Sequence, residues 1–151
     1  MKKIAFFLPI FFAIVTILSS CGGSAAEPSV KEKLSRVWTA NMVTWGSTSV
    51  YSSTTTSGTQ PGYKNFNLTL TSAGAATLAE FDGNSFSGTW ALSADEKTLI
   101  ITFTGNAPTG LTNNQLSYSI ANLTTSSVTL TTTQALIKAS NSAVTLTLAS
   151  K

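Results

Sequence analysis

The sequence predicts an all-β fold, an up-and-down antiparallel β-barrel of about eight strands, with a β-sandwich as the alternative. Apolar residues alternate with Ser and Thr through most of the chain from Val37 onward, which indicates strands with one buried and one wet face. Turn-forming residues separate these runs, so hairpins should join most of the strands. An open sheet of this size would expose two edges, and closing it into a barrel removes them.

The alternating runs supply the predicted core. A first strand begins at Val37, a short one is expected around residues 49–53, and residues 75–81 form another. In the remaining six runs one face is apolar, and the opposite face is rich in Thr and Ser, which suit a wet strand face. The apolar positions of these runs are Phe66, Leu68, Leu70, Phe86, Trp90, Leu92, Leu99, Ile101, Phe103, Leu116, Tyr118, Ile120, Val128, Leu130, Val144, Leu146 and Leu148. Together with Trp38, their aromatic members are predicted to form the core rather than to contact a ligand.

Turns and one short helix complete the predicted elements. Asp82-Gly83 is a strong hairpin signal between two of the strands. A short helix is expected over residues 29–36, where Ser29 can cap and Glu32 lies three residues on. Other turns are expected at residues 72–74, 94–97 and 122–126, with looser stretches at 46–62 and 105–114. No Cys–Trp–Cys pattern supports an immunoglobulin-type sandwich.

The first 21 residues have the pattern of a secretory signal. Lys2 and Lys3 precede an apolar run over residues 4–18, and small residues follow at the expected cleavage point. Leu18-Ser19-Ser20-Cys21 resembles the bacterial lipobox, and the resemblance implies that the Cys21 thiol takes a diacylglyceryl group and that Cys21 becomes the mature N-terminus when the signal is then removed. The alternatives are a membrane-anchor helix and an ordinary signal peptide. We therefore expect a signal peptide at residues 1–20, a tether at 21–30 and a barrel domain at 31–151.

Cysteine content and net charge limit the binding partners that the sequence predicts. Cys21 is the only cysteine, so it cannot form a disulfide within the chain. Loss of Lys2 and Lys3 with the signal lowers the net charge from +3 to +1, so the basic pI is no evidence for nucleic-acid binding. Only Glu27 is acidic close behind Cys21, so a surface-export signal is not evident. We expect a lipid-anchored protein of the cell envelope, in the outer membrane and facing the periplasm.

Two short motifs resemble lipocalin-like proteins. Leu34-Ser35-Arg36-Val37-Trp38 resembles the entry to the first lipocalin strand, where a tryptophan plugs the closed end, although Arg36 stands where the family has glycine. Residues 86–90 (FSGTW), followed by residues 93–99, resemble small lipocalin-like lipoproteins of Bacteroidetes. The resemblance spans residues 31–149 and implies a lipocalin-like barrel. Some members of the family bind small apolar molecules, and the roles of many are unknown.

The sequence holds no evident catalytic or cofactor-binding set. It has no histidine, and a lipidated Cys21 would supply no thiol nucleophile, so we predict neither an enzyme nor a metal or cofactor site. Glu80 and Asp82 are two residues apart and could act as a pair in glycoside hydrolysis. The simpler interpretation places Asp82 in a turn and has Glu80 solvate a strand end. Asp95 and Glu96, beside Lys97, are expected to form a solvated hairpin.

Three aromatic residues outside the regular strand phase are the candidate ligand contacts. Trp45, Tyr51 and Tyr63 flank or lie in the Ser/Thr-rich stretch, and loops at a barrel mouth often carry binding function. The alternative is that this loop simply packs over the barrel end. We therefore expect a small apolar or amphipathic ligand, or else an interaction subunit that binds an envelope protein through a wet face or an edge strand.

Overall fold

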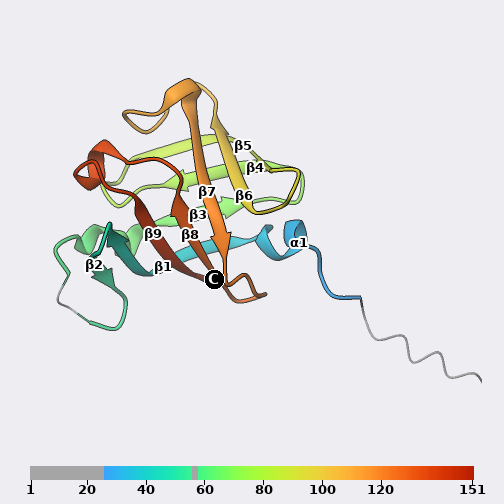
Figure 1. Cartoon of the computed structure of the whole chain (residues 1–151), viewed down its shortest axis with the longest axis horizontal. Coiled ribbons are helices and arrows are strands. Elements are labelled where there is room, and N and C mark those ends of the chain that lie inside the picture. The colour runs from blue at the N-terminus through green and yellow to red at the C-terminus, as the bar shows by residue number, and fades with distance from the viewer. Residues whose placement is uncertain (1–25, 56–57) are drawn as a thin grey trace, which may run out of the picture.

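The computed structural model describes residues 26–55 and 58–151, and these fold into one antiparallel sheet that closes on itself (Figure 1). The sheet order is β2-β1-β3-β4-β5-β6-β7-β8-β9, and β1 also pairs with β9. The strands are β1 (Val37–Trp45), β2 (Thr48–Ser52), β3 (Asn67–Leu70), β4 (Ala75–Ala79), β5 (Ser85–Leu92), β6 (Thr98–Phe103), β7 (Gln115–Ala121), β8 (Ser127–Thr132) and β9 (Val144–Ser150). The helices are α1 (Val30–Leu34) and three 3₁₀ turns, η1 (Pro61–Asn65), η2 (Thr112–Asn114) and η3 (Ile137–Ala139).

The predicted barrel is confirmed, with eight strands in the closed barrel and β2 as an additional strand. Strand β1 makes this possible because its two halves have different neighbours on one edge. Val37–Thr39 pair with β3, whereas Met42–Trp45 pair with β2. The other edge of β1 pairs with β9 from Trp38 to Trp45 and closes the ring. The β-sandwich alternative is therefore wrong for this chain.

A β-bulge in β1 shifts the phase of the strand. The pairing with β9 slips between Ala40 and Met42, which leaves Asn41 as an extra residue. Trp38 and Ala40 are buried before the bulge, and Val43 is buried after it. Trp45 lies two residues beyond Val43 and is half-buried against the core. Its position is thus regular once the bulge is counted, which explains why simple alternation does not predict it.

The core lies inside the barrel and follows the predicted alternation. Every predicted apolar face contributes buried side chains, and Phe86, Leu92 and Ile120 are half-buried against them. Among the described residues, Thr132 is the one buried residue that is neither aliphatic nor aromatic. Its hydroxyl accepts a hydrogen bond from the backbone N–H of Val144 at 2.9 Å and donates one to the carbonyl of Gln134 at 2.8 Å.

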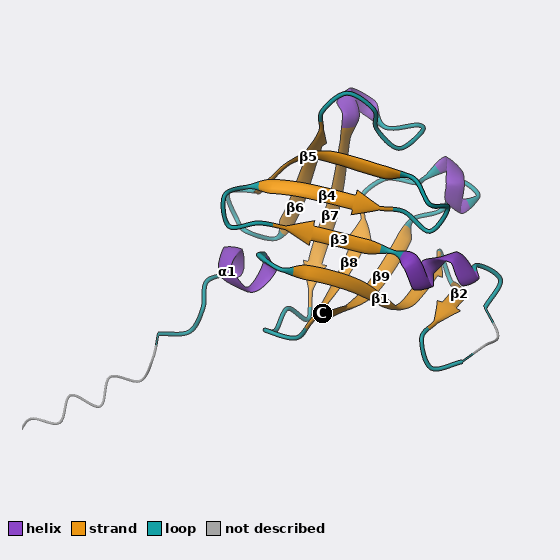
Figure 2. Ribbon diagram, turned by 180° about the vertical axis from the view of Figure 1, so that it is seen from behind, coloured by secondary structure: helices purple, strands orange, loops and turns teal. Residues whose placement is uncertain are grey.

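Helix α1 lies at one end of the barrel, beside the start of β1 (Figure 2). Its predicted capping box is present, since the Ser29 side chain accepts from the Glu32 N–H and the Glu32 carboxylate accepts from the Ser29 N–H. The Trp38 indole donates to the Leu34 carbonyl at 3.0 Å, and the Arg36 guanidinium lies 5.6 Å from the centre of the Trp38 ring. The expected plug at this end is therefore in place, and the opposite end is the mouth.

No helix in the described part of the chain is long and apolar enough to span a membrane. The expected signal peptide and Cys21 lie outside the described residues.

Candidate functional site

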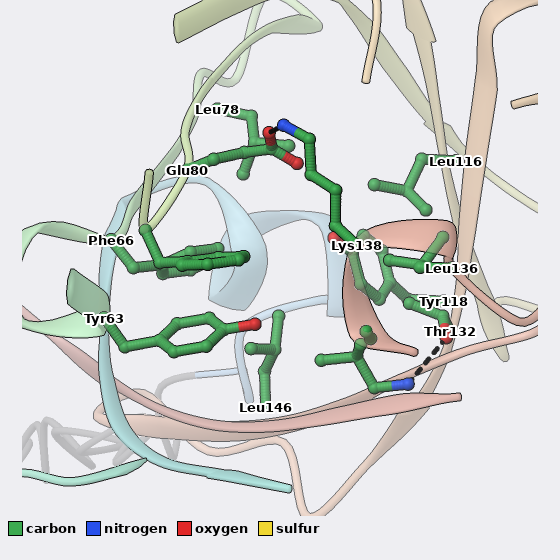
Figure 3. Close-up of a pocket in the computed structure, with 13 residues that line it drawn as sticks. Tyr63, Phe66, Leu78, Glu80, Leu116, Tyr118, Thr132, Leu136, Lys138 and Leu146 are labelled. Atoms are coloured by element: carbon green, nitrogen blue, oxygen red, sulfur yellow. Dashed lines mark hydrogen bonds and ion pairs between the residues drawn. The ribbon is translucent and has the colours of Figure 1, made fainter. Parts of the chain in front are cut away.

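A small cavity lies at the mouth, between the ends of β3, β4, β7, β8 and β9 and the segments η1 and η3 (Figure 3). Most of its walls are aliphatic or aromatic, and Tyr118 and Tyr63 add two hydroxyl groups. Glu80 and Lys138 are its charged residues. The walls are completed by Phe66, Leu78, Phe81, Leu116, Thr132, Leu136, Ala139, Val144 and Leu146. The site is therefore mainly apolar, with an ion pair at its rim.

The volume of the cavity limits what it can hold in this conformation. It measures about 30 Å³, whereas one water molecule requires at least about 10–15 Å³. The barrel interior is thus almost filled by its own side chains, one of the two outcomes expected for eight strands. Any ligand larger than about two water molecules must displace a segment that covers the mouth.

Three charged side chains meet at this mouth. The Lys138 ammonium pairs with the Glu80 carboxylate and lies 2.7 Å from Asp82 Oδ2. The Glu80 side chain is only 11% exposed, so the expectation that it solvates a strand end is wrong. Glu80 directly follows β4, and Lys138 covers it from η3. Asp82 is 31% exposed and lies in the predicted hairpin turn, where its carboxylate accepts from the Asn84 N–H.

The environments of the three groups set their pKa values in different directions. Burial raises the pKa of Glu80, and its hydrogen bond with Lys138 offsets this only in part. Asp82 is slightly desolvated, but hydrogen bonds from Lys138 and Asn84 outweigh this and lower its pKa. Burial alone would lower the pKa of Lys138, and the two carboxylates raise it above its usual value. Lys138 therefore stays charged near neutral pH.

The three predicted aromatic residues come together beside the cavity. The Trp45 indole donates to the Tyr63 hydroxyl at 3.1 Å, and the rings of Tyr51 and Tyr63 are 6.0 Å apart between centres. Tyr63 also stacks on Phe81 at 4.6 Å. Of the three, only Tyr63 lines the cavity, whereas Trp45 and Tyr51 are half-buried behind it. Their direct contact with a ligand stays a prediction.

Tight packing fixes Tyr63 in this cluster. Gly62 lies so close to the turn between β4 and β5 that a Cβ at this position would be 2.2 Å from the Phe81 carbonyl oxygen. Glycine therefore allows η1 to seat Tyr63 over the barrel end. Burial raises the pKa of the Tyr63 hydroxyl to about 12, so it remains protonated at physiological pH. Burial likewise raises the pKa of Tyr118.

No family model matches the sequence, and no curated protein matches it. A solved structure described as a lipocalin-like protein from Bacteroides uniformis ATCC 8492 is similar, with a TM-score of 0.53 and 14% identity. The similarity covers 79% of this chain and 99% of that chain. The fold is lipocalin-like. An uncharacterized protein from Bacteroides eggerthii DSM 20697 is also similar, with a TM-score of 0.50, 10% identity, and coverage of 78% of this chain and 99% of that one.

Sequence reasoning missed three residues of the mouth of this lipocalin-like barrel. Tyr118 and Thr132 lie in strand phase, so alternation assigns them to a strand but does not show that they border a cavity. Lys138 could have been singled out from the sequence. After Lys97 the only other basic residue is the terminal Lys151, so a lone lysine beside Leu136 and Ile137 stands out. What the sequence does not show is that β4 and η3 lie together.

The described residues give no direct support to catalysis. They contain no group of three or more Cys, Asp and Glu side chains placed to hold a metal ion. Both carboxylates of the Glu80–Asp82 pair are bound to Lys138, which leaves neither as an unengaged base in this conformation. The sequence-based expectation of a non-enzyme stays a prediction.

Proposed function

We propose that this protein is a lipid-anchored lipoprotein whose lipocalin-like barrel binds a small apolar or amphipathic ligand at its mouth. One observation carries the binding proposal: the cavity has aliphatic and aromatic walls and a mostly buried ion pair at its rim. Apolar walls with a few placed polar groups are typical of small-molecule sites. The likeness to solved lipocalin-like structures supports the architecture and does not identify a ligand.

Binding requires the segment between β8 and β9 to move, because the cavity is small. Residues 133–143 form most of their backbone hydrogen bonds among themselves, including those from the Leu136 N–H to Ser142 and from the Asn141 N–H to Leu136. Contacts across the mouth are made by the packing of Leu136 and Ala139 and by the Lys138 ion pairs. The two ends of the segment are bonded to the barrel, since the Thr133 N–H donates to the Ser117 carbonyl and the Gly46 N–H donates to the Ala143 carbonyl. We therefore expect the residues between these two bonds to lift as a unit while the barrel strands stay paired.

A cavity-filling variant tests the binding proposal. Leu116 is 1% exposed and lines the cavity from β7, which stays in place when the segment lifts, so Leu116→Phe should narrow the site and weaken the binding of a fluorescent fatty-acid probe at least about tenfold. Leu123→Phe is the matched control, because Leu123 is half-buried and does not line the cavity. Native mass spectrometry of protein taken from its envelope should show a bound small molecule. Absence of both probe binding and bound molecules would refute the proposal.

The anchor has its own test. We propose that Cys21 carries the lipid and that residues 21–30 tether the barrel to the periplasmic face of the outer membrane. Two acyl chains would suffice for stable attachment, whereas one holds only marginally. A clickable fatty-acid label should enter the wild-type protein in cells but not Cys21→Ser. Equal labelling of both proteins would contradict a lipid on Cys21.

The second candidate is an interaction subunit that binds an envelope protein. The observation behind it is β2, which pairs with only one strand among the described residues. Its outer edge is partly covered, since the Gln60 N–H donates to the Val50 carbonyl at 3.0 Å. Crosslinking in membranes that recovers one reproducible partner at β2 would favour this role over ligand binding.

A further inference from the structure

The Lys138 side chain occupies the mouth in the manner of a ligand. Its stem lines the cavity and its ammonium reaches Glu80 (Figure 3). The ammonium lies 2.7 Å from Asp82 Oδ2. The ammonium also lies 5.8 Å from the centre of the Phe86 ring, within the range of a cation–π contact. One side chain thus combines an apolar chain and a cationic head at this site.

The groups that contact the Lys138 ammonium lie on β5 and on the β4–β5 hairpin, whereas Lys138 itself lies on the segment between β8 and β9. Glu80 and Asp82 lie in the β4–β5 hairpin, which is closed by hydrogen bonds from the Glu80 N–H to Asn84 and from the Gly83 N–H to Glu80. Phe86 belongs to β5 itself. Lys138 lies on the self-bonded segment 133–143. Lifting this segment would remove the cation and leave its acceptors in place.

The rim of the cavity carries an excess of negative charge. Two carboxylates, Glu80 and Asp82, face a single ammonium, so the rim has a net negative charge even with Lys138 in place. This charge favours a ligand whose polar end is a positively charged hydrogen-bond donor.

We propose that the mouth binds a primary ammonium at the end of an apolar chain, and that Lys138 occupies this subsite until such a ligand displaces it. This inference rests on the proposed ligand-binding function and names the class of ligand. An anionic head would meet two carboxylates across the mouth. A neutral head would leave Glu80 buried and uncompensated once Lys138 had moved, which is strongly unfavourable. An alkylammonium replaces the contacts of Lys138 one for one.

Calorimetric titration of the full-length protein in phospholipid nanodiscs tests the inference, with empty nanodiscs as the reference. The probes are hexylammonium, hexanol and hexanoate at about pH 7, where an alkylammonium is charged as lysine is. Hexylammonium should bind Lys138→Ala about tenfold or more tightly than it binds the wild-type protein, because no internal cation competes. It should also bind at least about tenfold more tightly than the other two probes. Lys97→Ala, on a distant hairpin, is the matched control and should leave all affinities unchanged.

Glu80→Gln and Asp82→Asn, combined with Lys138→Ala, should abolish the preference for hexylammonium while leaving hexanol binding intact. If Lys138→Ala does not fold, Lys138→Met keeps the apolar stem, removes the charge and should show the same preference. Equal binding of hexylammonium and hexanol to the folded variants would overturn the cation subsite while leaving ligand binding at the mouth intact. Binding of none of the three probes would overturn both.

Discussion

Two carboxylates that are two residues apart show how the fold assigns different properties to similar side chains. Asp82 is in an exposed turn, held by Asn84 and Lys138, and its pKa is lowered. Glu80 is covered by η3, and burial raises its pKa. Sequence alone favours a solvated role for both, because no local pattern shows that Lys138, 58 residues later, will cover Glu80. The partly buried ion pair between Glu80 and Lys138 is therefore created by tertiary structure, which brings together residues far apart in the sequence.

The raised pKa of Glu80 has a consequence for the pH dependence of stability. The folded state binds the proton of this group more tightly than the unfolded chain does, so its protonation stabilises the fold. This contribution is fully present below the unfolded pKa of about 4.5 and is lost as the pH rises through the folded value. The free energy of unfolding of the wild type, minus that of Glu80→Gln, should therefore be larger at pH 4.5 than at pH 7. Urea unfolding at both pH values measures this difference, and a change of opposite sign would show that Glu80 is not desolvated.

The aromatic cluster allows a matched pair of single-atom changes. Tyr63→Phe removes the acceptor of the Trp45 indole and should lower the free energy of unfolding by about 0.5–1.5 kcal/mol. Tyr51→Phe is the control, because the Tyr51 hydroxyl forms no hydrogen bond in the described structure, and it should change stability by less than about 0.5 kcal/mol. Urea titration followed by tryptophan fluorescence measures both. Equal effects would mean that the bond between Trp45 and Tyr63 contributes nothing.

At the scale of elements, most strands could be predicted from the sequence, but the bulge in β1 and the position of the segment between β8 and β9 could not. Alternation places β3 to β9 within a few residues, because each strand has one buried face and a matching turn. It does not reveal the bulge at Asn41, since an extra residue in one strand leaves no local signature. For the same reason Trp45, which the sequence analysis places outside strand phase, belongs to the inner face of β1. The segment 133–143 likewise has no sequence pattern that predicts its position over the cavity at the mouth.

Deleting Asn41 tests the role of the bulge. Without this residue, either Val43 and Trp45 turn outward or β1 loses its register with β9, because the side-chain period of a strand is two. Loss of the buried Val43 and the half-buried Trp45 from the core should cost at least about 3 kcal/mol. Asn41→Ala keeps the bulge and is the control, with an expected loss below about 1 kcal/mol. Chemical unfolding compares them, and a deletion that is as mild as the substitution would contradict this account of β1.

At the scale of the whole molecule, the barrel has two unlike ends. The α1 end is closed by Trp38, which bonds to Leu34 and lies under Arg36. The mouth is covered by a separable segment held through a charged contact. The closed barrel and its plugged end could be predicted from alternation and a short N-terminal motif. The mouth could be predicted only in part, because the sequence singles out Trp45, Tyr51 and Tyr63 but not the cavity or the lysine above it.

The central claim is that a small amphipathic ligand enters at the mouth, and methyl NMR of the leucine side chains tests it most directly. Leu78, Leu116 and Leu146 line the cavity, whereas Leu34 belongs to α1 and Leu70 lies at the same end, where its N–H donates to the Arg36 carbonyl. On titration with hexylammonium, saturable chemical-shift changes are expected at the three mouth leucines, and none at Leu34 and Leu70. Unchanged spectra, or changes that fail to concentrate at the mouth, would contradict it.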